Sequence, residues 1–174
     1  MHAQIHAALA LIDHLAATWG VGVLFVIVAL EAIGVPVPGE SGLVAASLLA
    51  ARGDLAIAHV FLAAFLGAVL GDSIGWLIGR RFGPAVLDRL GPHLGLTAAR
   101  RAGFEDRFRR QGIYVVATAR FVVILRQLNG LLAGTSGMAY RRFLAADLVG
   151  ALAWTSVWGL GPYFFADLFR AYTG

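Results

Sequence analysis

Three long apolar runs, each about as long as a membrane-spanning helix, limit what this chain can fold into. They cover Trp19 to Gly39, Leu55 to Gly79 and Phe143 to Ala166, and each contains few charged residues. A helix needs roughly 20 such residues to cross the hydrocarbon of a bilayer. Of all residues, 59% are hydrophobic and 14% are charged, whereas about 25% are charged in an average soluble domain. We therefore expect an all-α integral membrane protein, with residues 1–174 forming one membrane domain.

The positive charge gathers in one polar segment. The chain has no lysine, so its net charge of +4 comes from arginine, and eight of the 14 arginines lie between Arg80 and Gly112. In membrane proteins, arginine-rich connections between spans stay in the cytoplasm. Residues 80–112 are therefore expected to form a basic cytoplasmic segment, and nucleic acid is not an expected partner.

The first apolar run is interrupted by a turn. Pro36 and Pro38 lack backbone N–H donors and push the residues before them out of helical geometry, and Gly39 follows them. The apolar stretch from Ser41 to Ala51 is only about 16 Å long as a helix, which is half a bilayer. We therefore expect Pro36, Pro38 and Gly39 to form the tip of a re-entrant helical hairpin that faces protein and not lipid.

A second re-entrant hairpin is expected between Ile113 and Met138. Ile113 to Leu125 would enter the membrane, Gln127 to Gly130 would interrupt the helix, and Leu131 to Met138 would return. The alternative is one spanning helix with two buried arginines. Two opposed hairpins place ten of the 14 arginines on one side of the membrane, and the positive-inside rule favours that arrangement.

The two halves of the chain resemble each other. Phe61-Leu-Ala-Ala recurs as Phe143-Leu-Ala-Ala, 82 residues later. Two broken-helix units in opposite orientation form an inverted repeat, which is a transporter architecture. The expected organisation is an N-terminal interfacial helix over 1–18, a hairpin plus spanning helix over 19–79, the basic segment over 80–112, and a second hairpin plus spanning helix over 113–169.

Three acids in the apolar runs are candidates for proton coupling. An ionised carboxylate within hydrocarbon is costly, so it is usually paired, protonated or exposed to a cavity. On this ground Glu31, Glu40 and Asp72 are expected to exchange protons. The alternative for Glu40 is that it only caps the helix after the turn, where the helix dipole favours negative charge. The alternative for Asp72 is that it pairs with an arginine or caps a half-helix. Asp147 is expected to pair locally with Arg141 or Arg142.

Two arginines between Ile113 and Met138 are candidates for substrate binding. Arg120 and Arg126 keep their charge at any relevant pH. Two guanidinium groups in a shielded cavity form a bidentate site for phosphate or carboxylate, and Asn129 is expected to contribute to it. The alternative is that the arginines only neutralise Glu31 and Glu40, in a cluster of four charges.

Small residues recur every four positions along the second apolar run. A ladder of this kind on one helix face permits close helix packing. The expected packing residues are Gly67, Gly71, Gly75 and Gly79.

No catalytic residue, metal site or cofactor is expected. Gly134 to Gly137 fits the G-x-S-G pattern of rhomboid intramembrane proteases, but no histidine follows His93 to act as the base. The five histidines are scattered at no metal-ligand spacing, and cysteine is absent.

Taken together, these features resemble the DedA family of bacterial membrane proteins, which is related to the SNARE-associated or VTT-domain proteins of eukaryotes. The resemblance covers residues 20–165 and rests on five motifs: E-x₄-P-x-P-G-E at Glu31 to Glu40, G-D at Gly71-Asp72, I-G-R-x-x-G at Ile78 to Gly83, R-F-x₄-R at Arg120 to Arg126, and A-G-x₃-M at Ala133 to Met138. The family commonly has Gly before Arg120 and Pro three residues after it. Here these residues are Ala119 and Val123, which moves the expected bend to Asn129-Gly130.

The resemblance implies a proton-coupled flippase in the bacterial inner membrane that moves an anionic lipid carrier such as undecaprenyl phosphate for envelope biogenesis. The family's required acids match Glu31 and Glu40, and its required arginines match Arg120 and Arg126. The expected partners are membrane lipid and protons, a homo-oligomer is left as an open alternative, and no enzymatic activity is expected. The alternative function is a proton-coupled small-ion transporter, or a pH- or envelope-homeostasis protein that flips no lipid.

Overall fold

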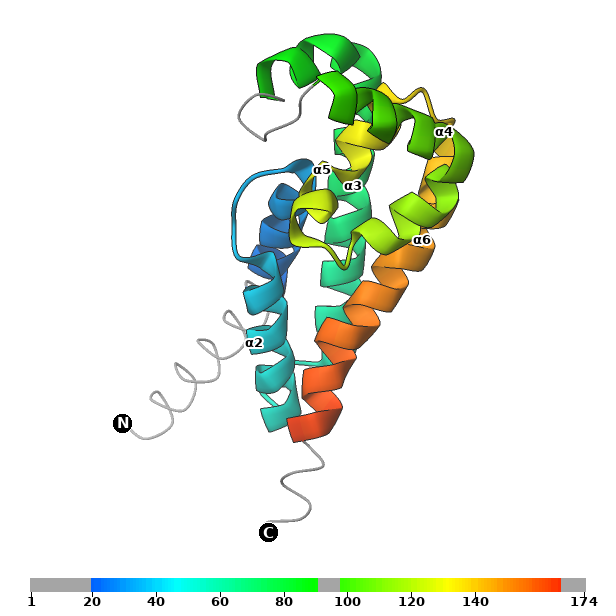
Figure 1. The fold of residues 1–174 in the computed structure, drawn as a ribbon. Helices are drawn as coiled ribbons and strands as arrows, with labels where there is room; N and C mark the ends of the chain where they lie inside the picture. Colours follow the sequence, from blue (N-terminus) through cyan, green and yellow to red (C-terminus); the bar gives the residue numbers. More distant parts are fainter. Residues whose placement is uncertain (1–19, 91–97, 167–174) are drawn as a thin grey trace, which may run out of the picture.

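The computed structural model describes residues 20–90 and 98–166, and within these ranges the chain is helical with no strand. The expected interfacial helix over residues 1–18 lies outside the described residues. The helices, shown in Figure 1, are Gly20–Ile33, α2 (Gly39–Arg52), α3 (Ile57–Leu90), α4 (Ala98–Ala119), α5 (Val123–Thr135) and α6 (Tyr140–Thr155), which continues through a π-helical turn, η2 (Ser156–Leu160), to Ala166.

Two of these helices are long and apolar enough to cross a membrane. They are Ile57–Gly83 and Tyr140–Ala166, with 27 residues each, which corresponds to about 40 Å of helix. The outer face of α3 is a row of half-exposed leucines, Leu62, Leu66 and Leu70. A surface helix of a soluble protein would place polar side chains on that face. The outward residues therefore match lipid as the surrounding solvent.

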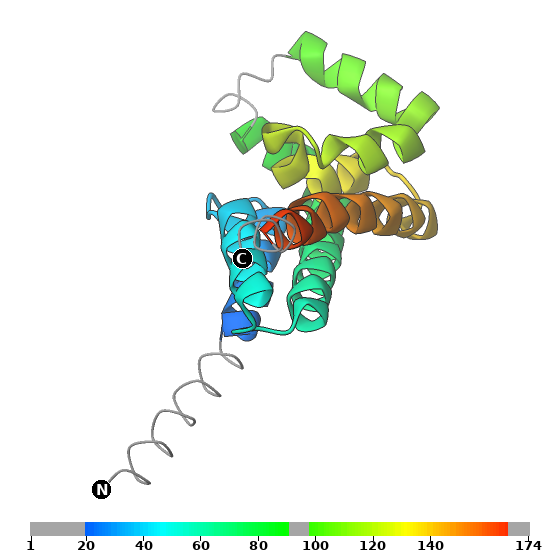
Figure 2. The same ribbon diagram turned by 90° about the horizontal axis from the view of Figure 1, so that it is seen from below.

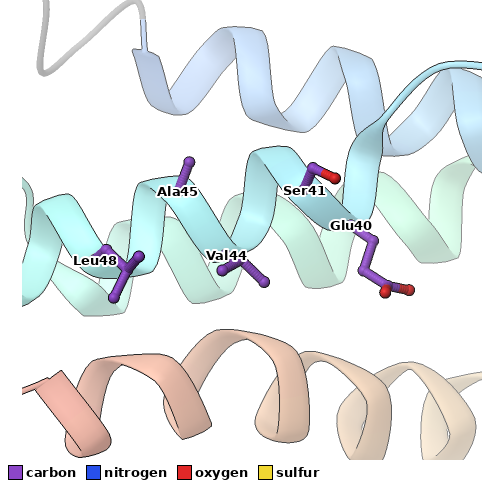
Figure 3. Close-up of a pocket in the computed structure, with 5 residues that line it drawn as sticks. All are labelled: Glu40, Ser41, Val44, Ala45 and Leu48. Carbon is purple, nitrogen blue, oxygen red and sulfur yellow. The ribbon is translucent and has the colours of Figure 1, made fainter.

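The first turn joins Gly20–Ile33 to α2 through residues 34–38. Gly34 has a φ of +114°, a conformation that favours glycine, and a Cβ there would lie 3.3 Å from the carbonyl oxygen of Gln127 in α5. Pro38 occupies the N-cap position and Gly39 begins α2. The chain thus reverses direction at the proline-glycine segment, and the two helices run side by side (Figures 1 and 3).

The second turn lies upstream of the expected position. Helix α4 ends at Ala119 and α5 begins at Val123, so Arg120 and the two residues after it form the turn. Residues 127–130 lie inside α5, and the predicted bend at Asn129-Gly130 is wrong. Val123 takes the first helical position of α5. Proline is tolerated best at this position of a helix.

Gly130 is needed for close packing and not for bending. A Cβ on Gly130 would lie 2.2 Å from the carbonyl oxygen of Asp72, and one on Gly134 would lie 2.1 Å from that of Trp76. Both carbonyls belong to α3. The backbones of α3 and α5 are therefore in direct contact, and a methyl group at either glycine would separate the two helices.

The glycine ladder of α3 contacts two different helices. A Cβ on Gly67 or Gly71 would lie 2.6 Å or 2.3 Å from a carbonyl oxygen of Gly20–Ile33, and one on Gly79 would lie 2.1 Å from the carbonyl oxygen of Leu131 in α5. At Gly75 the nearest atom would be 3.5 Å away, an ordinary van der Waals distance. Helix α3 is therefore the central element between the first helix and α5.

The basic segment is largely helical. Its described residues form the last turns of α3 and the first part of α4, and non-helical backbone at Gly83 and Gln111 marks kinks near its two ends. The start of α6 lies beside this end of α3, because the Trp76 indole donates a hydrogen bond to the Met138 carbonyl at 3.1 Å. The end of α2 lies at the opposite end of the molecule (Figure 1). Figure 2 shows α6 crossing the molecule with α2 and α3 on one side and α4 on the other.

Candidate functional site

The guanidinium group of Arg126 is held by two glutamates from the first pair of helices. Its Nη2 donates to Glu31 Oε1 at 2.7 Å, and its Nη1 donates to Glu40 Oε2 at 2.6 Å. Arg126 lies in α5, Glu31 at the end of the first helix and Glu40 in the first turn of α2. The planar fork of arginine suits such a double contact. This Arg126 cluster ties α5 to both helices that flank the first turn.

Local sequence explains how the Arg126 cluster forms. The turn at residues 34–38 brings Glu31 and Glu40 to the same place, and Gly39 leaves room between them. A Cβ on Gly39 would lie 2.3 Å from Glu31 Oε2. On another side, the Trp154 ring of α6 lies 5.3 Å from the guanidinium carbon of Arg126, which is within the range of a cation–π contact.

Arg120 is held by a different pair of acids. Its Nη2 donates to Asp72 in α3 and, at 2.7 Å, to Asp147 Oδ1 in α6. The side chains of all three residues are at most 1% exposed. This Arg120 cluster joins the turn after α4 to both long apolar helices.

Asp147 does not pair with its sequence neighbours, and the prediction that it pairs with Arg141 or Arg142 is wrong. Residues five or six positions apart on a helix do not face each other, since neighbours on a helix surface are three or four apart. Arg141 and Arg142 are exposed, whereas Asp147 shares the buried face of α6 with Phe143 and Trp154.

The expected cluster of four charges is therefore two clusters of three. The interpretation that Arg120 neutralises Glu31 and Glu40 is wrong, while Arg126 does contact both glutamates. When all groups are ionised, each cluster has one positive and two negative side chains. The Nε atoms of both arginines lack a hydrogen-bond partner among the described residues. The excess negative charge of each cluster nevertheless opposes binding of an anion until a carboxylate loses its charge or moves away.

The third predicted substrate-binding residue, Asn129, bridges two helices. Its side-chain nitrogen donates to the Val116 carbonyl of α4 at 3.2 Å, and the residue is 1% exposed. Its Oδ1 atom has no hydrogen-bond partner in the described chain. The contact positions α4 against α5, close to the turn that carries Arg120.

Buried polar atoms on α2 and α6 were not predicted from the sequence. Ser47 Oγ, Thr155 Oγ1 and Trp154 Nε1 are buried and lack a hydrogen-bond partner among the described residues. Ser47 and Thr155 both lie within 4 Å of the position of a Cβ on Gly159, in the π-helical turn. For α6, the sequence did contain one signal of a buried polar face. Asp147 and Trp154 are two helical turns apart, and this spacing places both on one face of the helix.

Glu40 is the accessible member of the Arg126 cluster. Its side chain is 34% exposed, against 7% for Glu31. Glu40 lies at one end of an open groove of about 290 Å³ along α2, which is otherwise lined by Ser41, Val44, Ala45 and Leu48 (Figure 3). The Glu40 carboxylate points away from the first helix, whereas Ser41 and Ala45 point toward it (Figure 3). The groove is mostly apolar and ends at a charged group.

Metal ligands do not gather within residues 20–90 and 98–166. No group of three or more histidine, cysteine, aspartate or glutamate side chains lies close enough together there to hold a metal ion. The four acids just described are instead distributed in pairs around two arginines.

Residues 37–163 match the family model described as the VTT domain. The chain is 43% identical over 134 residues to an uncharacterized membrane protein of Mycobacterium tuberculosis, covering 74% of this chain and 61% of the relative. It is 36% identical over 146 residues to one of Synechocystis, covering 84% and 67%. It is 28% identical over 176 residues to Protein DedA of Escherichia coli K12, covering 97% and 78%.

The chain thus spans about three fifths of the length of the mycobacterial relative. No solved structure matches it.

Proposed function

Because this chain belongs to the VTT-domain (DedA) family of membrane proteins, we propose that it is a transporter that moves an anionic lipid such as undecaprenyl phosphate across the membrane. The proposed partners are the lipid and protons, and the proposed location is the bacterial inner membrane with the basic segment facing the cytoplasm. The activity is transport and not covalent catalysis. The observation that carries the proposal is the Arg126 cluster, where a buried guanidinium meets an accessible acid at the end of an apolar groove.

The two turns are proposed to be the tips of opposed re-entrant hairpins. Helix α2 has 14 residues and α5 has 13, which corresponds to about 20 Å each, whereas the hydrocarbon core is about 30 Å thick. Each pair of shorter helices is followed by one long apolar helix, α3 or α6. At the second turn Arg120 is buried, and at the first turn a Cβ on Gly34 would approach α5. The other turn residues are mostly exposed, among them Pro36, Pro38 and Phe121, so the prediction that the first turn faces only protein is wrong. The lengths and order of the helices support an inverted repeat.

The charges of the Arg126 cluster support the proposed proton coupling. With Glu31 and Glu40 ionised, the cluster carries one excess negative charge and repels a phosphate. Protonation of Glu40 removes that excess and frees Nη1 of Arg126, which can then donate to a phosphate oxygen. Glu40 is the acid in this cluster with the larger exposure, so it is the one that we expect to exchange the proton. The lipid tail would follow the groove along α2.

The test is lipid translocation in liposomes that contain the purified protein and fluorescent undecaprenyl phosphate. Access of the label to a membrane-impermeant quencher reports the movement. We expect the wild-type protein and Arg52→Ala to translocate the lipid equally, because Arg52 is exposed at the end of α2. Arg126→Ala should abolish translocation. Equal translocation by Arg126→Ala and wild type would show that the proposed head-group site is wrong.

The alternative is a proton-coupled small-ion transporter that moves no lipid. The observation that favours it is the distribution of four acids over two buried arginines, which is sufficient for proton exchange without a lipid. The same liposomes, loaded with a pH-sensitive dye and free of undecaprenyl phosphate, separate the two functions. Proton flux in these liposomes, together with no lipid movement in the first assay, would favour the alternative.

A further inference from the structure

The Arg120 cluster contains a second pair of acids that the proposed head-group site does not use. We propose that Asp72 and Asp147 hold one proton between them, which makes this pair a buried proton-binding site separate from Glu31 and Glu40. The inference concerns the charge of the folded protein and does not depend on which substrate is moved.

The geometry brings the two carboxylates together. One oxygen of each accepts a hydrogen bond from the same atom, Nη2 of Arg120. Their remaining oxygens, Asp72 Oδ1 and Asp147 Oδ2, are buried and have no donor within the described chain. A proton on one carboxyl group would make it the donor that the other lacks.

The charge balance requires a further positive charge. The side chains of Asp72, Arg120 and Asp147 are at most 1% exposed, so water does not screen them. One guanidinium and two carboxylates leave one excess negative charge, and an uncompensated buried charge is strongly destabilising. Two carboxylates that share a site do not both ionise readily. With one proton, the cluster is neutral.

Among the residues that the structure describes, the surrounding elements supply no second cation. The charged groups that interact with Asp72 are Arg120 and Asp147. Helix α5 approaches Asp72 with the backbone of Gly130, and the first helix packs on the adjacent Gly71 with Ala29 and Ala32. The other buried arginine, in α5, is occupied by its own two glutamates. A proton is therefore the simplest compensation.

The two clusters differ in how their acids contact the arginine and in how far the acids are exposed. In the Arg126 cluster, each glutamate has its own guanidinium nitrogen, and Glu40 is partly exposed. In the Arg120 cluster, both acids share one nitrogen and are sealed from solvent. Loss of the proton from Asp72 and Asp147 would leave one excess negative charge between α3 and α6, and would weaken the bridge that Arg120 forms between the two long helices.

Infrared spectroscopy of the purified protein in lipid nanodiscs tests the proposal. We expect the carbonyl stretch of a protonated carboxyl group, shifted in D₂O, in the wild-type spectrum at neutral pH. Asp72→Asn and Asp147→Asn should each remove this band, since the remaining carboxylate alone balances Arg120. The matched control Glu31→Gln should retain it. A wild-type spectrum without a band that depends on Asp72 or Asp147 would overturn the proposal.

Thermal unfolding gives a second readout that does not depend on transport. An Asn at either position mimics the protonated acid, so each single variant should unfold within a few degrees of the wild type. The double variant leaves Arg120 without a counter-charge and should be destabilised by more than the two single variants together. If each single variant is as unstable as the double variant, or if added sodium restores stability where pH does not, the shared proton is wrong. Failure of lipid translocation alone would leave these results unchanged.

Discussion

At the scale of single residues, the absence of one side chain decides whether Glu31 reaches Arg126. Gly39 begins α2, and a Cβ on it would lie 2.3 Å from Glu31 Oε2. An added methyl group would displace Oε2, so the carboxylate would have to rotate or shift from the position in which Oε1 accepts from Nη2 of Arg126. Gly39 is therefore as important for the geometry of the cluster as for the turn that precedes it.

Gly39→Ala should lower lipid translocation by roughly tenfold or more, since a hydrogen bond between charged groups contributes about 1.5–3 kcal/mol. The matched control is Gly42→Ala in the same helix, because the nearest atom to a Cβ there is a Leu24 methyl group at 3.7 Å. Translocation rates of the two variants in liposomes make the comparison. Equal rates would contradict the role assigned to Gly39.

Arg126→Lys tests whether charge alone is sufficient. A lysine ammonium is a point charge, and it cannot present two nitrogens in the fork that contacts Glu31 and Glu40. We expect translocation to fall by about tenfold or more although the charge is kept, while Arg52→Lys retains the wild-type rate. Full activity of Arg126→Lys in the same assay would show that the planar geometry is unimportant.

At the scale of helices, the position of the first turn was predictable from the sequence and that of the second was not. Pro36 and Pro38 placed the first turn correctly because proline acts on its own backbone. The second turn contains no proline, and the glycine at position 130 was taken for the bend. A glycine that permits bending and one that permits close packing look the same in a sequence, because both only lack a Cβ. The α3 carbonyl that requires Gly130 is distant in the chain.

The ion pairs were predictable only in part for the same reason. The contact of Arg126 with Glu31 and Glu40 was among the expected alternatives, because few charges lie in the apolar runs. Asp147 was missed as a partner of Arg120, since this contact depends on the rotation of α6 that directs Asp147 inward. Pairing of Asp72 with an arginine was among the expected alternatives. That rotation is set by packing along the whole helix, including Phe143 and Trp154, and not by local sequence.

The glycine ladder gives a prediction at this scale, because its members are not equivalent. Gly79→Ala would press a methyl group against the Leu131 carbonyl, and overpacking of this kind costs about 1–3 kcal/mol. Gly75→Ala has room and should gain up to about 1 kcal/mol of helix propensity. Thermal unfolding in detergent should therefore show a lower Tm for Gly79→Ala and an unchanged or higher Tm for Gly75→Ala. The reverse order would contradict the packing of α3 on α5.

At the scale of the whole molecule, the membrane character was predictable because it depends on composition and on the length of apolar runs, not on contacts. The end of the molecule at which each long helix begins or stops was predictable for the same reason, because it follows from counting the apolar runs. The start of α6 and the end of the apolar part of α3 share one end of the molecule, and the end of α2 lies at the other (Figure 1). The positive-inside rule then orients the protein.

Single cysteines test this orientation cleanly, because the chain has none of its own. Asp54→Cys follows α2 and Ala139→Cys precedes α6, and both native residues are exposed. A membrane-impermeant maleimide should label Ala139→Cys only from the cytoplasmic side and Asp54→Cys only from the outer side, whereas both react after the membrane is dissolved. Labelling of both from the same side would contradict the proposed topology.

The most direct test of the account is the affinity of purified protein variants for a short-chain polyprenyl phosphate. If Glu40 competes with the phosphate for Arg126, Glu40→Gln should bind the ligand more tightly than the wild type at neutral pH, and Arg126→Ala should not bind it. Wild-type affinity in Arg126→Ala, or weaker binding by Glu40→Gln, would contradict the claim that an anionic head group replaces a carboxylate on Arg126.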